Sequence, residues 1–177
     1  MAIRDRARYW GATAEERTAT YPCDSYLDFP CEDWLRAIDI DAPPEHVFRW
    51  LCQLKLSSYS YDLFATRRRR GLNRLTAGAE QLEREQPFLV FEIVDFEPGR
   101  HISGVAAPPV ERLYGPMAAT YVVSPRGGGG SRLVAKMNIP GASPAARLRR
   151  ALLVWGYLVM SRKQFLTLKA LAEKSAA

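Results

Sequence analysis

The chain has 177 residues, of which 47% are hydrophobic and 25% charged, a composition that excludes a disordered or fibrous protein and is ordinary for a globular domain. This length suits a single domain with one sizeable core. The formal net charge is +6, which fits binding to nucleic acid or an anionic membrane, but no signature of a nucleic-acid-binding module accompanies it, and we expect no nucleic-acid partner.

The first third of the chain predicts an arm followed by a strand and a helix. Residues 1–33 are polar and contain two prolines, so we interpret them as an N-terminal arm packed on the domain of residues 34–177, with a short helix over Ala14–Arg17. Alternating apolar residues predict a strand over Trp34–Asp41. Pro43 and Pro44 end this strand and begin a helix, whose apolar stripe is Val47, Trp50, Leu51 and Leu54. A second short helix is expected from about Ser60.

The middle of the chain predicts consecutive strands. Gly78–Glu85 is a weak candidate, whereas Phe88–Phe96 is strongly apolar on both faces and is therefore expected to be buried on both. Pro98 and Gly99 then make a turn before a strand over Arg100–Ala107. Met117–Ser124 and Arg132–Ile139 flank four glycines and predict a hairpin.

The last predicted strand alternates cleanly between two faces. Leu133, Ala135, Met137 and Ile139 point one way, toward a core or cavity, and we expect the intervening side chains to be mostly in solvent. These intervening residues are Arg132, Val134, Lys136 and Asn138.

A long helix closes the chain, from about Pro144 to Lys174, with Ser143 as its N-cap. It contains ten consecutive apolar residues, Ala151–Met160, too few to cross a membrane, which needs about 20. We predict that its apolar stripe meets the sheet through Leu148, Leu152, Trp155 and Val159. Consecutive strands followed by one long helix indicate an α+β fold, in which a curved antiparallel sheet wraps the last helix.

Four stretches of this sequence resemble the START-like superfamily, also called SRPBCC, and within it the polyketide cyclase/dehydrase and lipid-transport group. They are Trp10–Thr13 with Glu15 and Glu16, Arg36–Glu45 with Val47–Gln53, Tyr59–Asp62, and Glu97–Arg100. The resemblance implies the helix-grip fold, with two short helices after the first strand. It also implies binding or transport of a small hydrophobic or amphipathic molecule, lipid- or polyketide-like, between the sheet and the last helix.

The candidate site residues are those expected to line this cavity. They are Tyr59, Tyr61, Asp62, Phe91, Met117, Tyr121, Leu133, Ala135, Met137, Trp155 and Val159. The first three form a polar cluster that could act in acid and base catalysis, although a helix cap with packed tyrosines explains them as well. A cyclase- or dehydratase-type enzyme is therefore an alternative to a binding protein, which we favour, and an interaction protein with a filled core is a second alternative.

The remaining motifs point away from cofactors. Cys23, Cys31 and Cys52 lack metal-ligand spacing, and whether Cys23 and Cys31 pair is left open. Gly127–Gly130 lack the form of a phosphate loop. We expect no metal and no other cofactor, and, because the N-terminus has no apolar signal segment, a cytoplasmic location.

Two clusters of arginine carry much of the positive charge, namely Arg67–Arg70 with Arg74, and Arg147 with Arg149 and Arg150. Solvated surface is the simplest interpretation, and a weak contact with an anionic membrane surface is the expected alternative. The sequence leaves the oligomeric state open.

Overall fold

The computed structural model describes residues 3–56, 73–141 and 147–176. It contains one seven-stranded sheet with the strand order β1-β2-β7-β6-β5-β4-β3. Every neighbouring pair is antiparallel except β1 with β2. The strands are β1 (Tyr9–Trp10), β2 (Cys31–Ile40), β3 (Pro87–Phe88), β4 (Phe91–Glu97), β5 (His101–Ala106), β6 (Ala118–Arg126) and β7 (Gly130–Pro140).

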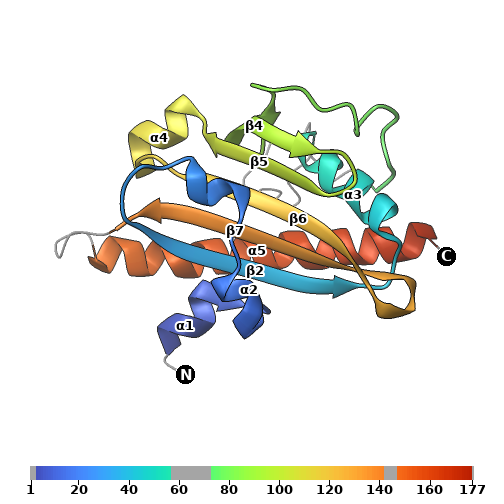
Figure 1. Ribbon diagram of the computed structural model, residues 1–177, viewed down its shortest axis with the longest axis horizontal. Coiled ribbons are helices and arrows are strands. Elements are labelled where there is room, and N and C mark those ends of the chain that lie inside the picture. The colour runs from blue at the N-terminus through green and yellow to red at the C-terminus, as the bar shows by residue number, and fades with distance from the viewer. Residues whose placement is uncertain (1–2, 57–72, 142–146, 177) are drawn as a thin grey trace.

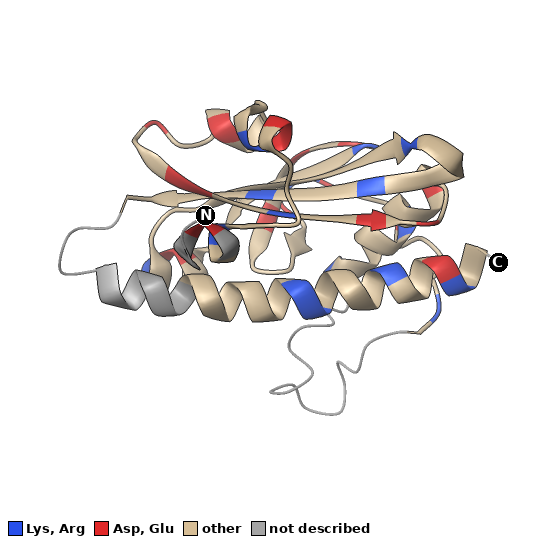
Figure 2. Ribbon diagram, turned by 90° about the horizontal axis from the view of Figure 1, so that it is seen from below, with Lys and Arg blue, Asp and Glu red and all other residues tan. Residues whose placement is uncertain are grey.

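The helices lie on the two faces of this sheet and at its ends. The long helix α5 (Arg147–Ala176) runs along one face, which we call the inner face, together with α3 (Pro44–Cys52), as Figures 1 and 2 show. The other described helices are α1 (Ile3–Arg8), α2 (Ala14–Thr18), α4 (Pro108–Tyr114) and the short 3-10 turns η1 (Pro22–Ser25), η2 (Gln53–Lys55) and η4 (Gly127–Gly129). The predicted α+β helix-grip fold is confirmed.

The first strand and helix form as their sequence predicts. Pro43 precedes α3, and Pro44 occupies its first turn, where a missing N–H costs nothing and the fixed φ favours the helix. The predicted stripe of Val47, Trp50, Leu51 and Leu54 is buried. The helix predicted from about Ser60, the N-cap Ser143 and the Arg67–Arg70 run lie outside the described residues.

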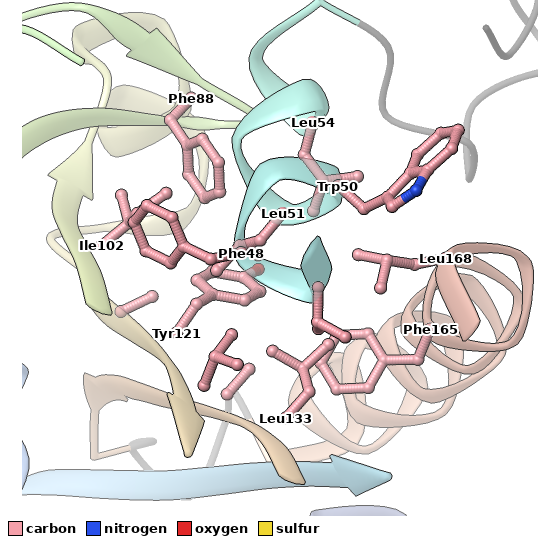
Figure 3. Packing of buried hydrophobic residues seen from close by; sticks show 14 of the residues in the cluster. Phe48, Trp50, Leu51, Leu54, Phe88, Ile102, Tyr121, Leu133, Phe165 and Leu168 are labelled. Carbon is pink, nitrogen blue, oxygen red and sulfur yellow. The ribbon is translucent and has the colours of Figure 1, made fainter. Parts of the chain in front are cut away.

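The inner face and the two helices enclose one hydrophobic core. Figure 3 shows Phe48 and Leu51 of α3 facing Phe165 and Leu168 of α5, with Tyr121 of the sheet nearby. The rings of Tyr121 and Phe165 lie 6.5 Å apart, within the range of favourable aromatic pairs. The predicted inward set of β7 belongs to this core, which confirms the register of that strand.

The opposite, outer face of β7 is not in solvent, contrary to the prediction. Val134, Lys136 and Asn138 are buried because the N-terminal arm lies across them. The amide of Asn138 and the ammonium of Lys136 both donate to Asp24 of η1, with the lysine nitrogen 2.8 Å from Asp24 Oδ1. Nearby, Arg132 pairs with Glu16 of α2 at 2.8 Å. The arm thus forms a second, smaller core on the outer face.

Two predictions for the middle strands are wrong. Gly78–Glu85 forms turns and loops instead of a strand. The apolar run Phe88–Phe96 is split by a tight turn at Leu89, whose φ of 59° is left-handed, so that Phe88 pairs with Phe91 across a hairpin. The turn contains no glycine or asparagine, the residues that normally announce this conformation, and β4 is consequently buried on one face and half-buried on the other.

The remaining strands agree with the prediction, with one addition. The glycine run forms the tip of the hairpin between β6 and β7, where Gly128 and Gly129 take a φ of 78°. Helix α4, which the sequence analysis did not predict, connects β5 to β6 and buries none of its residues.

Candidate functional site

The structure brings together most of the predicted cavity residues. Tyr121, Leu133, Ala135, Met137 and Phe91 are buried on the inner face. Met117, at the start of β6, is partly buried against the same core. These side chains come from β4, β7 and β6 with the residue before it, and they face α3 and α5. Tyr59, Tyr61 and Asp62 lie outside the described residues.

Two predicted cavity residues, Trp155 and Val159, do not lie on the side of α5 that faces the core, contrary to the prediction. Their side chains are 43% and 68% exposed, and they line a shallow groove of about 730 Å³ on the helix surface facing away from the sheet. Helix α5 instead turns Phe165, Leu168 and Ala172 toward the core. Because these three fix the rotation of the helix, Trp155 and Val159 fall on its opposite side.

A polar cluster on the inner face was missed by the sequence analysis. Its centre is Arg36, which belongs to β2 and is fully buried. Arg36 Nε donates to Ser161 Oγ of α5 at 3.1 Å, and Nη1 donates to the backbone oxygens of Arg8 and Leu35, both at 2.7 Å. The guanidinium also lies over the ring of Tyr157, 4.7 Å from its centre.

The second guanidinium nitrogen of Arg36 stands apart from this network. Nη2 is buried and has no hydrogen-bond partner, and no ion pair joins Arg36 to an acidic side chain within residues 3–56, 73–141 and 147–176. Burial lowers the pKa of Arg36 from its usual value, with the neighbouring phenols acting against this shift. An arginine remains protonated in proteins regardless, so the inner face holds a positive charge.

Two tyrosines extend the cluster from Arg36 into the core. Burial raises the pKa of the Tyr157 phenol, while the charge of Arg36 and a hydrogen bond with the Tyr121 side chain oppose that rise. The Tyr157 ring also packs on Trp34, 5.8 Å between centres. A guanidinium beside two phenols can bind a carboxylate or a carbonyl oxygen, and the phenols can donate hydrogen bonds to it.

A signal for Arg36 was present in the sequence. Residues of one strand alternate between faces, and Trp34, Ile38 and Ile40 all belong to the inner core. Arg36 is an even number of residues away from each of these three, so its side chain must point to the same, inner face. Arg36 entered the prediction only as part of a stretch that carries the family resemblance, and its inward direction was not predicted.

Side chains that could ligate a metal are dispersed in the described part of the chain. No group of three or more histidine, cysteine, aspartate or glutamate side chains there could hold a metal ion. The three cysteines are free, with Cys23 and Cys52 buried and Cys31 exposed. None of the described helices is long and apolar enough to cross a membrane.

The order and packing of these elements define the fold of the chain. The chain has the helix-grip fold of the START-like proteins, in which a curved sheet closes over a long C-terminal helix. No known family model matches the chain, and no curated protein matches it in sequence.

Solved structures with the same fold are distant in sequence. Norcoclaurine synthase of Thalictrum flavum, a point mutant in complex with a transition-state analogue, matches with a TM-score of 0.57 and 11% identity over 85% of this chain and 99% of that one. A protein of Nitrosomonas europaea matches with a TM-score of 0.52 and 13% identity over 81% of this chain and 95% of that one. The di-domain aromatase/cyclase StfQ of the steffimycin biosynthetic pathway reaches a TM-score of 0.48 at 14% identity, over 82% of this chain and 52% of that one. At these identities the likeness shows the fold alone.

Proposed function

We propose that this protein binds a small hydrophobic or amphipathic molecule, lipid- or polyketide-like, between the inner face of the sheet and α5. The observation that carries this proposal is the buried guanidinium of Arg36, whose Nη2 has no hydrogen-bond partner within residues 3–56, 73–141 and 147–176. A core that serves only to hold the fold together gains nothing from an uncompensated charge, because burying one costs several kcal/mol. A ligand would compensate the charge, while the apolar side chains around it would supply most of the affinity.

Native mass spectrometry of freshly purified protein tests this proposal most directly. A co-purified small molecule would establish binding and reveal its chemical class. Displacement of a fluorescent apolar probe by a library of lipids and aromatic compounds tests it independently. Leu133→Trp provides the matched variant, since Leu133 is fully buried on the inner face and a larger side chain there should compete with any ligand. Absence of both co-purified molecules and displacement would favour the filled-core interaction protein.

Catalysis by a cyclase or dehydratase mechanism is the second candidate. The hydrogen-bonded phenols of Tyr157 and Tyr121 beside Arg36 favour it, since a phenol can donate a proton to a carbonyl oxygen that the guanidinium holds. A fold shared with norcoclaurine synthase is compatible with an enzyme and does not imply that reaction. An enzyme would show turnover whose pH profile changes in Tyr157→Phe, and also in Tyr61→Phe or Asp62→Asn if those residues take part.

A weak contact with an anionic lipid surface is a further proposal, and α5 supports it. Three exposed apolar side chains, Trp155, Val159 and Leu166, lie in the same groove as Arg162 and Lys163. Apolar side chains flanked by basic ones suit the interface of an anionic bilayer. Cosedimentation with phosphatidylserine-containing vesicles, weakened in Trp155→Ser and by salt, would support this contact. Binding that salt does not weaken would exclude the basic side chains from it.

We also propose a cytoplasmic location. It is supported by three free cysteines, one of them exposed, because exposed thiols persist in a reducing compartment. Fractionation of the native host would test it.

A further inference from the structure

The hydrogen bonds of Arg36 use two of its three guanidinium nitrogens as donors and leave the third, Nη2, unused. A guanidinium has five N–H donors in a fixed plane. Nε donates to Ser161, and Nη1 donates to two backbone oxygens, so these two nitrogens are satisfied. Both donors of Nη2 are buried without an acceptor among the residues that the structure describes. A buried donor without an acceptor is rare in native proteins and calls for a specific partner.

The surroundings of Arg36 limit what that partner can be. One face of the guanidinium is covered by the Tyr157 ring, 4.7 Å from its carbon, so a partner must approach in the plane of the guanidinium, along the edge that carries Nη2. In-plane approach to two N–H groups suits the oxygens of a carboxylate. Apart from Arg36, Ser161 and the two tyrosines, most of the buried side chains on this face are apolar, which suits a ligand with one polar end and a hydrocarbon body.

The charge of the site favours a carboxylate over a phosphate. Lys136 and Arg132 belong to the outer face and already pair with Asp24 and Glu16. No second lysine or arginine contributes to the inner core as far as the structure describes the chain. A single buried positive charge balances a monoanion, whereas a phosphate dianion would leave net charge inside the protein.

We propose that Arg36 is the anchor for the carboxylate of an amphipathic ligand, such as a fatty acid or another carboxylic acid with an apolar body. This inference rests on the proposed function, because it names the chemical class of the molecule held between the inner face and α5. Since Nη2 is closed to solvent in this structure, neighbouring side chains must part to admit the carboxylate, and the apolar body of the ligand then takes their place in the core.

The test compares two probes of equal length, dodecanoate and dodecanol, by isothermal titration of the intact protein at pH 8. The wild type should bind dodecanoate about 10- to 100-fold more tightly, the ratio expected for a hydrogen-bonded charge pair. In Arg36→Met the two affinities should become equal within about threefold, because only the carboxylate loses a partner. Arg112→Gln, which removes an exposed charge of α4, is the matched control and should keep the wild-type ratio.

The outcomes separate this inference from the proposed function. Equal binding of both probes by the wild type would overturn the anchor and leave the binding function standing. Binding of neither probe would overturn both. A preference for dodecanoate that persists in Arg36→Met, or disappears in Arg112→Gln, would place the anionic site elsewhere. Because the wild-type comparison needs no variant, the inference can fail even if Arg36→Met does not fold.

Discussion

The rotation of α5 determines which of its side chains hold the protein together, and a pair of variants tests it. Phe165 is fully buried and contacts the rings of Trp10 and Tyr121, with centres 6.4 and 6.5 Å away. Trp155, ten residues earlier on the same helix, is 43% exposed. We expect Phe165→Ala to reduce the free energy of unfolding by about 3–5 kcal/mol, the usual cost of removing a core phenylalanine.

Trp155→Ala should cost about 1 kcal/mol or less, because the side chain already keeps much of its surface in water and alanine favours the helix. For a chain of this size, 1 kcal/mol shifts the melting temperature by about 2–4 °C. Phe165→Ala should therefore melt at least about 6 °C below the wild type, and Trp155→Ala within a few degrees of it.

Urea titration followed by circular dichroism measures both free energies. The sequence-based stripe through Leu148, Leu152, Trp155 and Val159 predicts instead a large loss of stability at Trp155. If Trp155→Ala proved as destabilising as Phe165→Ala, the rotation of α5 described here would be wrong, and Trp155 would return to the core.

Three further outcomes follow from the arm and the cysteines. Gly11→Ala should be severely destabilising, since a Cβ there would lie 2.0 Å from a backbone oxygen of β2. Gly99 has a similar left-handed φ but open space around it, so Gly99→Ala should cost only about 1 kcal/mol. Chemical denaturation of both variants measures the difference. Thiol titration of the native protein should detect Cys31 rapidly, and the other two cysteines only on unfolding, because they are buried and burial raises their pKa values to about 11 and about 12. Partial burial opposes ionisation of Asp24, but hydrogen bonds, that from Lys136 foremost, hold its pKa below the usual value. A carboxyl of this kind stabilises the fold above its unfolded pKa and less as pH falls, so Asp24→Asn should lower stability at pH 7 and flatten its decline toward pH 3.

Much of the fold was predictable because it depends on local patterns. The alternation in Leu133–Ile139 determined which side of β7 faces the core, and Pro43 and Pro44 marked where β2 ends and α3 begins. The burial of the outer face could not be predicted from such a local pattern. Lys136 and Asn138 look like solvent-facing residues, and only the long-range return of the arm, which brings Asp24 onto them, reveals that they are buried.

The error on α5 has a different physical origin. The run Ala151–Met160 is apolar on all sides, so it has no periodicity from which a rotation could be derived. The rotation is set further along, where Ser161, Phe165, Leu168 and Ala172 are buried at spacings of four, three and four residues. Tracing that pattern backward by seven residues from Ser161 reaches Val154, which is buried, and leaves Trp155 on the exposed side.

The buried cations of this protein provide a comparison within one molecule. On the outer face, Arg132 and Lys136 each lie within 2.8 Å of a carboxylate, the arrangement that makes a buried charge tolerable. On the inner face, Arg36 is more deeply buried than either and lacks such a partner in the described part of the chain. If Arg36 serves only stability, Arg36→Met must remove three hydrogen bonds, two of which hold α5 and α1 to β2, and the free energy of unfolding should fall by about 3–5 kcal/mol.

If Arg36 instead awaits a ligand, its charge destabilises the empty protein, because an unbalanced buried charge costs several kcal/mol, and removing that charge offsets the loss of the three hydrogen bonds. We therefore expect delipidated Arg36→Met to unfold within about 1 kcal/mol of the delipidated wild type. Saturating dodecanoate should then raise the stability of the wild type, by about 2.7 kcal/mol at a concentration of 100 times the dissociation constant, and should raise that of the variant much less at the same concentration. A large loss of stability in the ligand-free variant, with no gain for the wild type on adding dodecanoate, would show that Arg36 is a structural residue, and the anchor would have to be abandoned.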